Sequence, residues 1–265
     1  MSPLRAFNDA VSSAVRQSAS TGFFFDFDGT LAPIMNDPDA VLPVPGVVDR
    51  LRRLTRLVGY VAIISARPVE FLRERFAGAS DLHLFGLYGL QTIVGGQVRT
   101  DKEAAPWAPV IRRLVAEALA ELPAEILVED KSLAMALHYR RAPALREVVE
   151  RWAAAKAAEL GVAEQYGRMV VELKPPVARD KGTVVARTIA PLTGAWYFGD
   201  DISDERAFDA LRVRRERDPA FAGFTVAVAN GETGKELARD ADYSINSPED
   251  MPALLDAVLN AFPRI

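Results

Sequence analysis

The fold is predicted from one segment, which reads Phe23-Phe24-Phe25-Asp26-Phe27-Asp28-Gly29-Thr30-Leu31-Ala32-Pro33-Ile34. Its apolar run lies between Thr21-Gly22 and Gly29-Thr30, a pattern typical of a strand buried on both faces of a parallel sheet. Two carboxylates, Asp26 and Asp28, end that strand, and unpaired buried charge is strongly destabilising. They are interpreted either as loop aspartates that cap the following segment or as part of a site for a hard divalent cation, which binds carboxylate, water and phosphate oxygens. We favour the cation site.

The composition excludes several classes of protein. With 265 residues, of which 49% are hydrophobic, the chain can bury a substantial core in one large domain or two modest ones. Its net charge of -4 argues against a general nucleic-acid surface. The sequence has no cysteine, which excludes disulfides and thiolate metal sites. No apolar run is long enough to span a bilayer, and no signal-peptide core precedes Ser20. We therefore expect a cytoplasmic protein that binds neither nucleic acid nor membrane.

Two further buried-strand patterns also end in polar residues. One ends at Ser65, which from the pattern alone is interpreted as the N-cap of the following helix. The other ends at Asp200 and Asp201, and Ser203 is expected to cap the next helix, with Asp204 in its first turn. Because open parallel sheets bind ligands at the carboxyl ends of their strands, these groups are expected to converge with the first carboxylate pair.

A lysine opens another predicted helix. Lys181 stands in the first turn of that helix, where the helix end is already positive and a cation is unfavourable. A solvated lysine tolerates this placement, so the pattern alone favours a surface position.

The pattern changes character in the middle of the chain. From about residue 104 to 176 it predicts a helix, two strands within 126–139, a second helix over 145–160, and a last strand over 168–174 that stops at Pro175-Pro176. We therefore predict an α/β domain over 104–176. It is inserted between two parts of a core, residues 1–103 and 177–265, and the core starts with an amphipathic helix over 4–18.

Side chains two residues apart on a strand point to the same face, and this spacing places several polar residues on one face of the inserted sheet. Glu129 and Lys131 share a face if their strand stays extended, as do His138 and Arg140 on the neighbouring strand. Glu172 projects opposite to the apolar residues beside it. The face is interpreted as solvated surface or as the floor of a polar ligand site, and the pattern alone favours surface.

These motifs, in this order, resemble the four signatures of the haloacid-dehalogenase-like (HAD) phosphohydrolases. The family pattern is Asp-x-Asp-x-Thr, a Ser or Thr after the second strand, a Lys, and Gly-Asp-x-x-x-Asp. The matching residues here are Asp26, Asp28, Thr30, Ser65, Lys181, Gly199, Asp200 and Asp204. The resemblance implies an α/β fold with a HAD-like Rossmannoid parallel-sheet core and an inserted α/β cap domain.

The same resemblance implies a role for each residue. Asp26 attacks phosphorus and Asp28 acts as general acid and base, while Ser65 and Lys181 stabilise the charge of the phosphate. Mg²⁺ is the implied cofactor, and the implied metal-site residues are Asp26, Asp28 through its backbone carbonyl, Asp200, Asp201 and Asp204. Of these, Asp201 and Asp204 are expected to bind metal waters or to position Lys181.

Longer stretches resemble the trehalose-6-phosphate phosphatases. They are residues 26–34, Val128-Glu129-Asp130-Lys131 with His138-Tyr139-Arg140, Val171-Glu172-Leu173-Lys174-Pro175, and Gly199-Asp200-Asp201 through Phe208. The resemblance runs from about residue 22 to 250, and it reverses the preference for a solvated face on the inserted sheet. It implies a phosphatase of trehalose 6-phosphate, a small molecule bound by Glu129, Lys131, His138, Arg140, Glu172 and Arg67. We expect a monomer.

The chain departs from that family pattern in three places. Ser65-Ala66-Arg67 stands where Ser-Gly-Arg is usual, Ser203 replaces Thr, and Tyr88-Gly89-Leu90-Gln91 replaces His-Gly-x-Glu. The Tyr88 and Gln91 changes bear on sugar specificity rather than on the chemistry. One alternative is therefore a HAD phosphatase for another sugar phosphate, such as sucrose phosphate or mannosyl-phosphoglycerate. The other is a catalytically silent regulatory HAD module.

Overall fold

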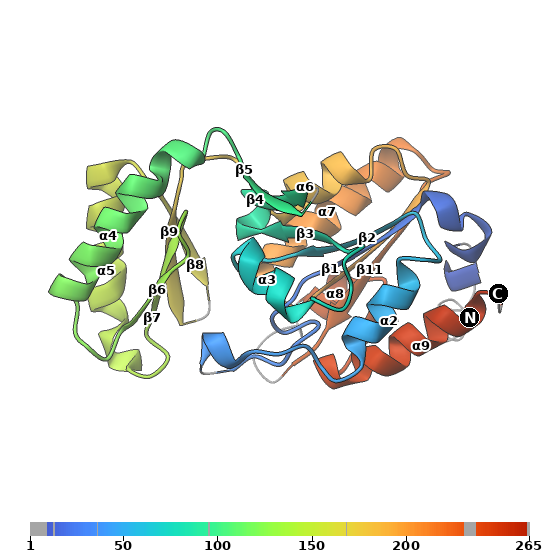
Figure 1. Cartoon of the computed structure of the whole chain (residues 1–265), viewed down its shortest axis with the longest axis horizontal. Helices are drawn as coiled ribbons and strands as arrows, with labels where there is room; N and C mark the ends of the chain where they lie inside the picture. The colour runs from blue at the N-terminus through green and yellow to red at the C-terminus, as the bar shows by residue number, and fades with distance from the viewer. Residues whose placement is uncertain are drawn as a thin grey trace. The chain divides into compact units, whose positions relative to one another are not determined.

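The computed structural model describes residues 10–12, 14–35, 37–94, 96–167, 169–230 and 237–263. The chain divides into two compact units, of which one comprises Met1–Gln97 with Arg179–Ile265 and the other Val98–Ala178. Both combine a sheet with helices (Figure 1), so the predicted α/β class is confirmed. None of the described helices has the length and apolar character that crossing a membrane requires.

The larger of the two sheets is mostly parallel, as predicted. Its order within the described residues is β12-β11-β10-β1-β2-β3-β4-β5, with parallel pairing from β12 to β3 and antiparallel pairing of β3 with β4. The strands are β1 (Thr21–Phe25), β2 (Tyr60–Ile64), β3 (His83–Gly86), β4 (Gln91–Val94), β5 (Gln97–Thr100), β10 (Gly194–Gly199), β11 (Ala222–Val228) and β12 (Tyr243–Ile245).

Aromatic residues fill both faces of the central strand β1, which explains why its sequence is a continuous apolar run. Phe24 lies in register with Tyr197 of β10 and belongs to a core cluster shared with α6 (Lys181–Thr188) and α7 (Ile202–Arg217). On the opposite face, Phe23 stacks on Trp196 with ring centroids 5.9 Å apart, and Phe25 stacks on Phe198 at 4.5 Å. Such ring pairs add stability beyond the area they bury.

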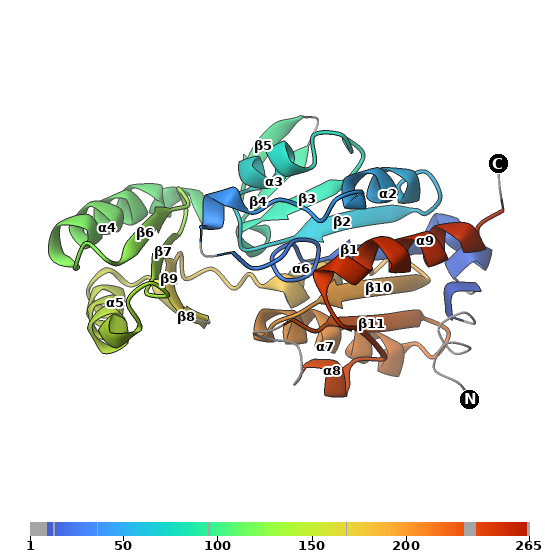
Figure 2. The ribbon, with the colours of Figure 1, turned by 90° about the horizontal axis from the view of Figure 1, so that it is seen from below.

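Helices cover both faces of this sheet (Figures 1 and 2), with α6 and α7 on one side and α2 and α9 on the other. An ion pair of 2.6 Å between Arg50 and Asp256 joins α2 to α9. The helices are α2 (Val47–Leu54), α3 (Val69–Arg75), α6 (Lys181–Thr188), α7 (Ile202–Arg217), α8 (Leu237–Asp240) and α9 (Met251–Ala261). Of the helix expected over 4–18, residues 10–12 and 14–16 are helical, and residues 4–9 and 13 lie outside the described part of the chain.

The second unit is a four-stranded antiparallel sheet, in the order β6-β7-β9-β8 among the described residues, with two helices on one face (Figure 1). Its elements are α4 (Ala108–Glu121), β6 (Leu127–Asp130), β7 (Met135–His138), α5 (Arg146–Leu160), β8 (Ala163–Gly167) and β9 (Val170–Lys174). β8 was not among the predicted strands. Its residues Ala-Glu-Gln-Tyr-Gly lack β-branched side chains, and pairing with β9 rather than local propensity makes them a strand.

Candidate active site

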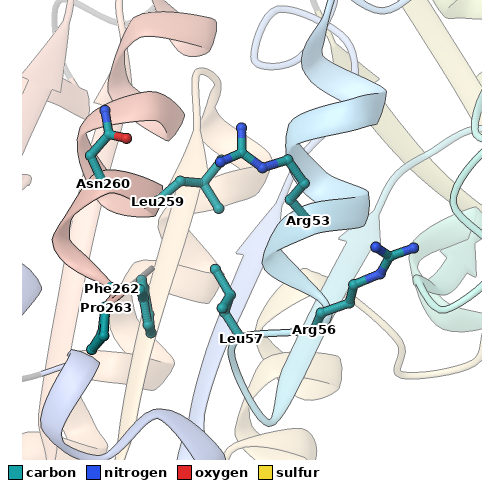
Figure 3. A pocket seen from close by; sticks show the side chains of 7 residues that line it. All are labelled: Arg53, Arg56, Leu57, Leu259, Asn260, Phe262 and Pro263. Atoms are coloured by element: carbon teal, nitrogen blue, oxygen red, sulfur yellow. The ribbon is translucent and has the colours of Figure 1, made fainter. Parts of the chain in front are cut away.

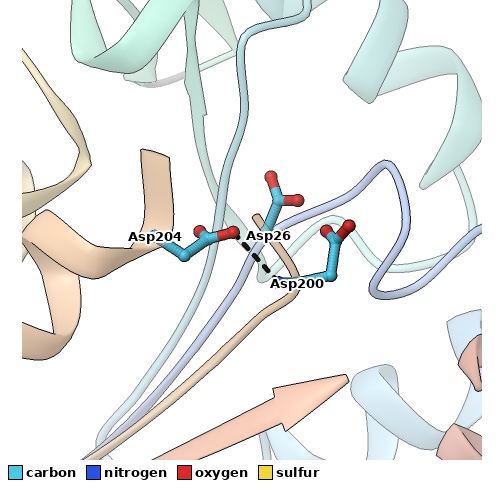
Figure 4. Close-up of side chains that lie close together, drawn as sticks. All are labelled: Asp26, Asp200 and Asp204. Atoms are coloured by element: carbon cyan, nitrogen blue, oxygen red, sulfur yellow. Dashed lines mark hydrogen bonds between the residues drawn. The ribbon is translucent and has the colours of Figure 1, made fainter. Parts of the chain in front are cut away.

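Three adjacent parallel strands bring the predicted groups of the first unit to one edge of the sheet. β1 lies between β10 and β2, and Asp26, Asp200 and Ser65 are the residues that directly follow these strands. The backbone N–H of Asp26 donates to the Phe198 carbonyl at 2.9 Å, which extends the ladder into the site. Carboxylate oxygens of Asp26, Asp200 and Asp204 lie within 4.8 Å of one another, and all three residues are buried (Figure 4). Of the groups expected to converge, Asp26 and Asp200 therefore do so, together with Asp204.

Lys181 is part of this cluster and is not a surface residue. Its Nζ lies 2.8 Å from Asp26 Oδ1 and 2.8 Å from Asp204 Oδ1, and the residue is only 2% exposed. It is the first residue of α6, whose N-cap Asp180 accepts from the Thr183 N–H at 2.7 Å. Two carboxylates thus offset the unfavourable placement of a cation at a helix N-terminus.

Asp204 uses both carboxylate oxygens to hold its neighbours. Oδ1 accepts from Lys181 Nζ and from the Tyr197 hydroxyl at 2.6 Å, and Oδ2 accepts from the backbone N–H groups of Asp200 at 3.1 Å and Asp201 at 3.2 Å. Of the two roles expected for Asp204, these contacts support the positioning of Lys181. Tyr197 was not predicted as a site residue. Its sequence position could have indicated a role, because the hydroxyl of a tyrosine inside a buried strand requires a hydrogen-bond partner.

Asp201 is the N-cap of α7, and the expectation that Ser203 caps this helix is wrong. Asp201 Oδ1 accepts from the Ser203 N–H at 2.9 Å and from Ser203 Oγ at 2.6 Å. A carboxylate two residues before an amide forms this turn readily and also favours the positive helix end. Although burial opposes the effect, Lys181 and Ser203 lower the pKa of Asp201.

Asp200 is oriented by two donors from different loops. Thr30 Oγ1 donates to Oδ1 at 3.2 Å, and Asn230 Nδ2 donates to Oδ2 at 2.8 Å. Gly29 has φ of +82°, and a Cβ there would lie 2.2 Å from Asp200 Oδ2, so this loop position requires glycine. Asn230 follows β11 at the same sheet edge and was not predicted as a site residue.

Asp26, Asp200 and Asp204 are called the acidic group below. Asp28 lies outside this group and pairs with Arg67. Arg67 Nε donates to Asp28 Oδ2 at 2.8 Å, and an Nη donates to Oδ1 at 2.7 Å. The backbone N–H of Arg67 also donates to Ser65 Oγ at 3.1 Å. Arg67, which was expected to bind substrate, is therefore bonded to two other predicted site residues.

Burial and like charge dominate the electrostatics of the acidic group. Burial raises the pKa of Asp26 well above 3.8, outweighing the opposite effect of Lys181, and Asp204 and Asp200 raise it further. Burial also raises the pKa of Asp204 to about 6. For Lys181, burial lowers the pKa, but Asp204 and Asp26 outweigh it and hold the pKa well above 10.5. The single positive charge of Lys181 therefore does not balance the carboxylates of the acidic group.

The donor set suits a hard divalent cation. Asp26, Asp200 and Asp204 carry three carboxylates against the single ammonium of Lys181, which leaves two excess negative charges when all are ionised. The donors are oxygens, as Mg²⁺ prefers. Since Asp204 is occupied by four hydrogen bonds, Asp26 and Asp200 are the carboxylates that fit a metal.

The polar residues of the second unit form two pairs. Lys131 Nζ lies 2.9 Å from Glu172 Oε1 with both residues buried, and His138 Nε2 lies 2.8 Å from Glu129 Oε2. Glu129 and Glu172 are both in register with Ala136, so they share one sheet face. The other face carries Met135, Leu137, Val171 and Leu173, which pack with α4 and α5. Arg140 lies in the turn after β7.

The two departures near residue 90 have structural roles. Gln91 Oε1 accepts from the Val69 N–H at 3.1 Å, which satisfies a donor at the start of α3. Tyr88 is buried with a left-handed φ of 57°, and its N–H donates to the Ser65 carbonyl at 2.9 Å. The backbone at Tyr88 therefore supports the loop that presents Ser65.

A surface pocket of about 760 Å³ lies between the ends of α2 and α9 (Figure 3). Its lining consists of Arg53, Arg56, Leu57, Leu259, Asn260, Phe262 and Pro263. The predicted site residues are not among them, so this pocket is separate from the sheet edge that carries the acidic group.

Comparison with known proteins agrees with this arrangement. The trehalose-phosphatase family model matches residues 24–248. A trehalose-phosphate phosphatase of Mycobacterium marinum is 35% identical over 239 residues, which cover 85% of this chain and 58% of the relative. The chain thus spans less than two thirds of that protein.

Two solved structures share the fold. The C-terminal domain of a C. albicans trehalose-6-phosphate phosphatase matches with a TM-score of 0.75 at 22% identity, covering 96% of both chains. The C-terminal domain of a Candida albicans trehalose synthase regulatory protein matches with a TM-score of 0.66 at 18% identity, covering 97% of both. With the family model spanning most of the sequence, the chain belongs to the trehalose-phosphatase family.

Proposed function

We propose that this protein is a Mg²⁺-dependent phosphatase that hydrolyses trehalose 6-phosphate to trehalose and phosphate. The observation that carries the proposal is the buried contact of Lys181 with Asp26 and Asp204 at the carboxyl edge of the sheet. An ammonium held beside a candidate nucleophile is suited to a phosphoryl group, whose transfer depends on positioning and charge stabilisation. Family membership supports the sugar phosphate as substrate. We further propose that the protein is a monomer and that it is cytoplasmic; the cysteine-free sequence agrees with the second of these.

The proposed reaction has two steps. An Asp26 carboxylate oxygen attacks phosphorus in line and the bond to the sugar oxygen breaks, which yields an aspartyl-phosphate. Asp28 gives its proton to the departing sugar oxygen and then removes a proton from the water that hydrolyses the intermediate. Ser65 and Lys181 stabilise the negative charge of the transferred group.

Mg²⁺ would be held by Asp26, Asp200 and the backbone carbonyl of Asp28, and it would screen the phosphate charge from the carboxylates. The Asp204 contacts described above support a separate role for that residue, which keeps Lys181 in place. Asp201 caps α7 and lies 3.9 Å from Lys181, which supports a similar structural contribution.

We propose that the sugar is bound by the polar face of the second unit. Glu129, Lys131, His138, Arg140 and Glu172 are the proposed ligands. The burial of the Lys131–Glu172 pair supports this role. Removing two charges from water costs free energy that apolar residues at these positions would avoid, so the pair is better explained by ligand binding than by stability. This unit is then the cap domain of the enzyme.

The silent regulatory module is a weaker alternative. The fold alone does not separate the two, since the regulatory domain from Candida albicans shares it. Asp26, Asp28, Ser65, Lys181 and Asp200 are all present in this chain, and their contacts favour an enzyme.

The deciding experiment measures phosphate release from trehalose 6-phosphate, glucose 6-phosphate and sucrose 6-phosphate, with Mg²⁺ and with a chelator. We expect strong preference for the trehalose ester and loss of activity on chelation. Equal and weak release from all three esters would point to another sugar phosphate, and no release would favour the silent module.

The nucleophile is tested by Asp26→Asn. Because the amide oxygen cannot form the aspartyl-phosphate, phosphate release should fall to background while thermal unfolding stays cooperative. Asp49→Asn on the exposed surface of α2 is the control and should keep normal activity. Substantial turnover by the Asp26 variant would remove Asp26 from this role.

A further inference from the structure

Arg67 is bonded to Asp28 in a way that limits the movement of that carboxylate. Its planar guanidinium uses two nitrogens to reach both oxygens, at 2.8 Å and 2.7 Å. The Arg67 side chain is only 9% exposed, whereas that of Asp28 is 31% exposed. A bidentate pair specifies the direction of a carboxylate as well as its distance, which a single contact with an ammonium does not do.

Aromatic packing holds Arg67 itself. The Arg67 guanidinium carbon lies 4.7 Å from the centre of the Phe71 ring. Phe71 in turn meets Phe27 edge-on, with centroids 5.9 Å apart. Phe27 stands between Asp26 and Asp28 in the sequence, so the contacts close a ring from the loop after β1 to α3 and back to Asp28.

We infer that Arg67 is a positioning residue for Asp28 and not a ligand of the sugar. The inference rests on the proposed function, in which Asp28 exchanges a proton with the sugar oxygen and then with water. A partly exposed carboxylate samples several rotamers, and proton transfer requires a donor–acceptor geometry that only some of them provide. In the ionised form of Asp28, which removes a proton from water, the two Arg67 bonds select one orientation. In the protonated form, which acts on the sugar oxygen, the remaining carbonyl oxygen still accepts from Arg67. The backbone N–H of Arg67 also donates to the Ser65 hydroxyl.

The test compares Arg67→Gln and Arg67→Lys with a matched control, Arg75→Gln. Arg75 lies over the same Phe71 ring at 4.1 Å, but its guanidinium donates to the backbone carbonyls of Val41 and Asp39. Each variant is assayed with trehalose 6-phosphate and with p-nitrophenyl phosphate, an ester without a sugar. Each is also combined with Asp28→Asn.

A positioning role predicts that Arg67→Gln lowers kcat about 10- to 100-fold on both esters and changes KM less than about threefold. Arg67→Lys should recover only part of kcat, since an ammonium restores the positive charge but not the two parallel N–H donors of the guanidinium. In the Asp28→Asn background, Arg67→Gln should lower kcat by less than about threefold, because its effect passes through Asp28. Arg75→Gln should stay within about twofold of the unaltered enzyme.

Three results would overturn the inference. A higher KM for trehalose 6-phosphate, with kcat kept and p-nitrophenyl phosphate unaffected, would make Arg67 a sugar ligand. Equal losses with and without Asp28→Asn would show that Arg67 acts independently of Asp28, and a Tm far below that of Arg75→Gln would trace such losses to folding. If the unaltered protein hydrolyses p-nitrophenyl phosphate but not the trehalose ester, the proposed substrate is wrong. The comparison of the single and double variants on p-nitrophenyl phosphate then still tests the role of Arg67. Release from neither ester overturns both.

Discussion

At the scale of single residues, the site depends on how two buried carboxylates share one ammonium. Lys181 contacts Asp26 and Asp204 at equal distances of 2.8 Å, but the two acids have different surroundings. Asp204 has further donors in Tyr197 and two backbone amides, so it serves as an anchor. Asp26, whose pKa is raised by burial, is the group that gains from an added cation. Local partners thus give different roles to residues of the same type.

Tyr197→Phe tests the anchor. The change removes one hydrogen bond to a carboxylate in a buried site, so the free energy of unfolding should fall by about 1–2 kcal/mol. We also expect a lower kcat with little change in KM, because Asp204 then holds Lys181 less firmly. Chemical denaturation and steady-state kinetics measure the two effects. Tyr60→Phe in β2, whose ring stacks on His83, is the control, and equal effects of the two variants on kcat would contradict the prediction.

At the scale of elements, strand ends and helix starts meet at the site. The loops after β1, β2 and β10 supply Asp26, Ser65 and Asp200, and the N-termini of α6 and α7 supply Lys181 and Asp204. Both helices begin with an aspartate cap that accepts from a backbone N–H inside the first turn. These caps fix the first turn of each helix and therefore the side chains that it carries into the site.

Asp180→Ala tests whether the α6 cap positions Lys181. Loss of the bond to the Thr183 N–H should reduce the free energy of unfolding by about 1 kcal/mol. Because Lys181 is the next residue, kcat should fall as well. Asp180→Ser keeps a capping oxygen and should restore most of both quantities in denaturation and kinetic assays. Equal behaviour of the Ala and Ser variants would show that the cap is not responsible.

At the scale of the whole molecule, two compact units carry different parts of the proposed task. The first holds the acidic group, and the second holds the buried Lys131–Glu172 pair on the sheet face opposite α4 and α5. Variants of the first unit should therefore affect every phosphate ester. Variants of the polar face should affect only substrates that contain the sugar.

Glu172→Gln tests this division. Removing the charge opposite Lys131 should raise KM for trehalose 6-phosphate by about tenfold or more, while kcat/KM for p-nitrophenyl phosphate stays nearly constant. The control is Glu164→Gln, since Glu164 lies on β8 in register with Leu173 of the apolar face and bonds to Tyr166. Equal losses on both esters would contradict a role in sugar binding, and Tm measurements would identify any loss of folding.

The stability of the metal-free protein should depend on pH through Asp26. The pKa of Asp26 in the folded protein lies above its ordinary value of 3.8. Its contribution to the free energy of unfolding is therefore fully present below pH 3.8 and is lost as the pH rises through the folded-state pKa. Mg²⁺ needs the ionised carboxylate, so added Mg²⁺ should raise Tm more at about pH 7.5 than at about pH 5. Thermal unfolding with Mg²⁺ and with a chelator measures this. Asp26→Asn should remove most of the pH dependence of the Mg²⁺ effect, and equal shifts at both pH values in the unaltered protein would contradict the assignment.

The sequence by itself determined the mostly parallel sheet and the edge at which Asp26, Ser65 and Asp200 meet. Buried parallel strands have continuous apolar runs, and their carboxyl ends share one edge whatever the details of packing. Only the tertiary structure decided that Arg67 pairs with Asp28, that Tyr197 and Lys181 hold Asp204, and that Asp201 rather than Ser203 caps α7. These choices depend on side-chain directions and on contacts such as Thr30 with Asp200, 170 residues apart. Local sequence patterns do not encode such distances, since packing of distant segments sets them.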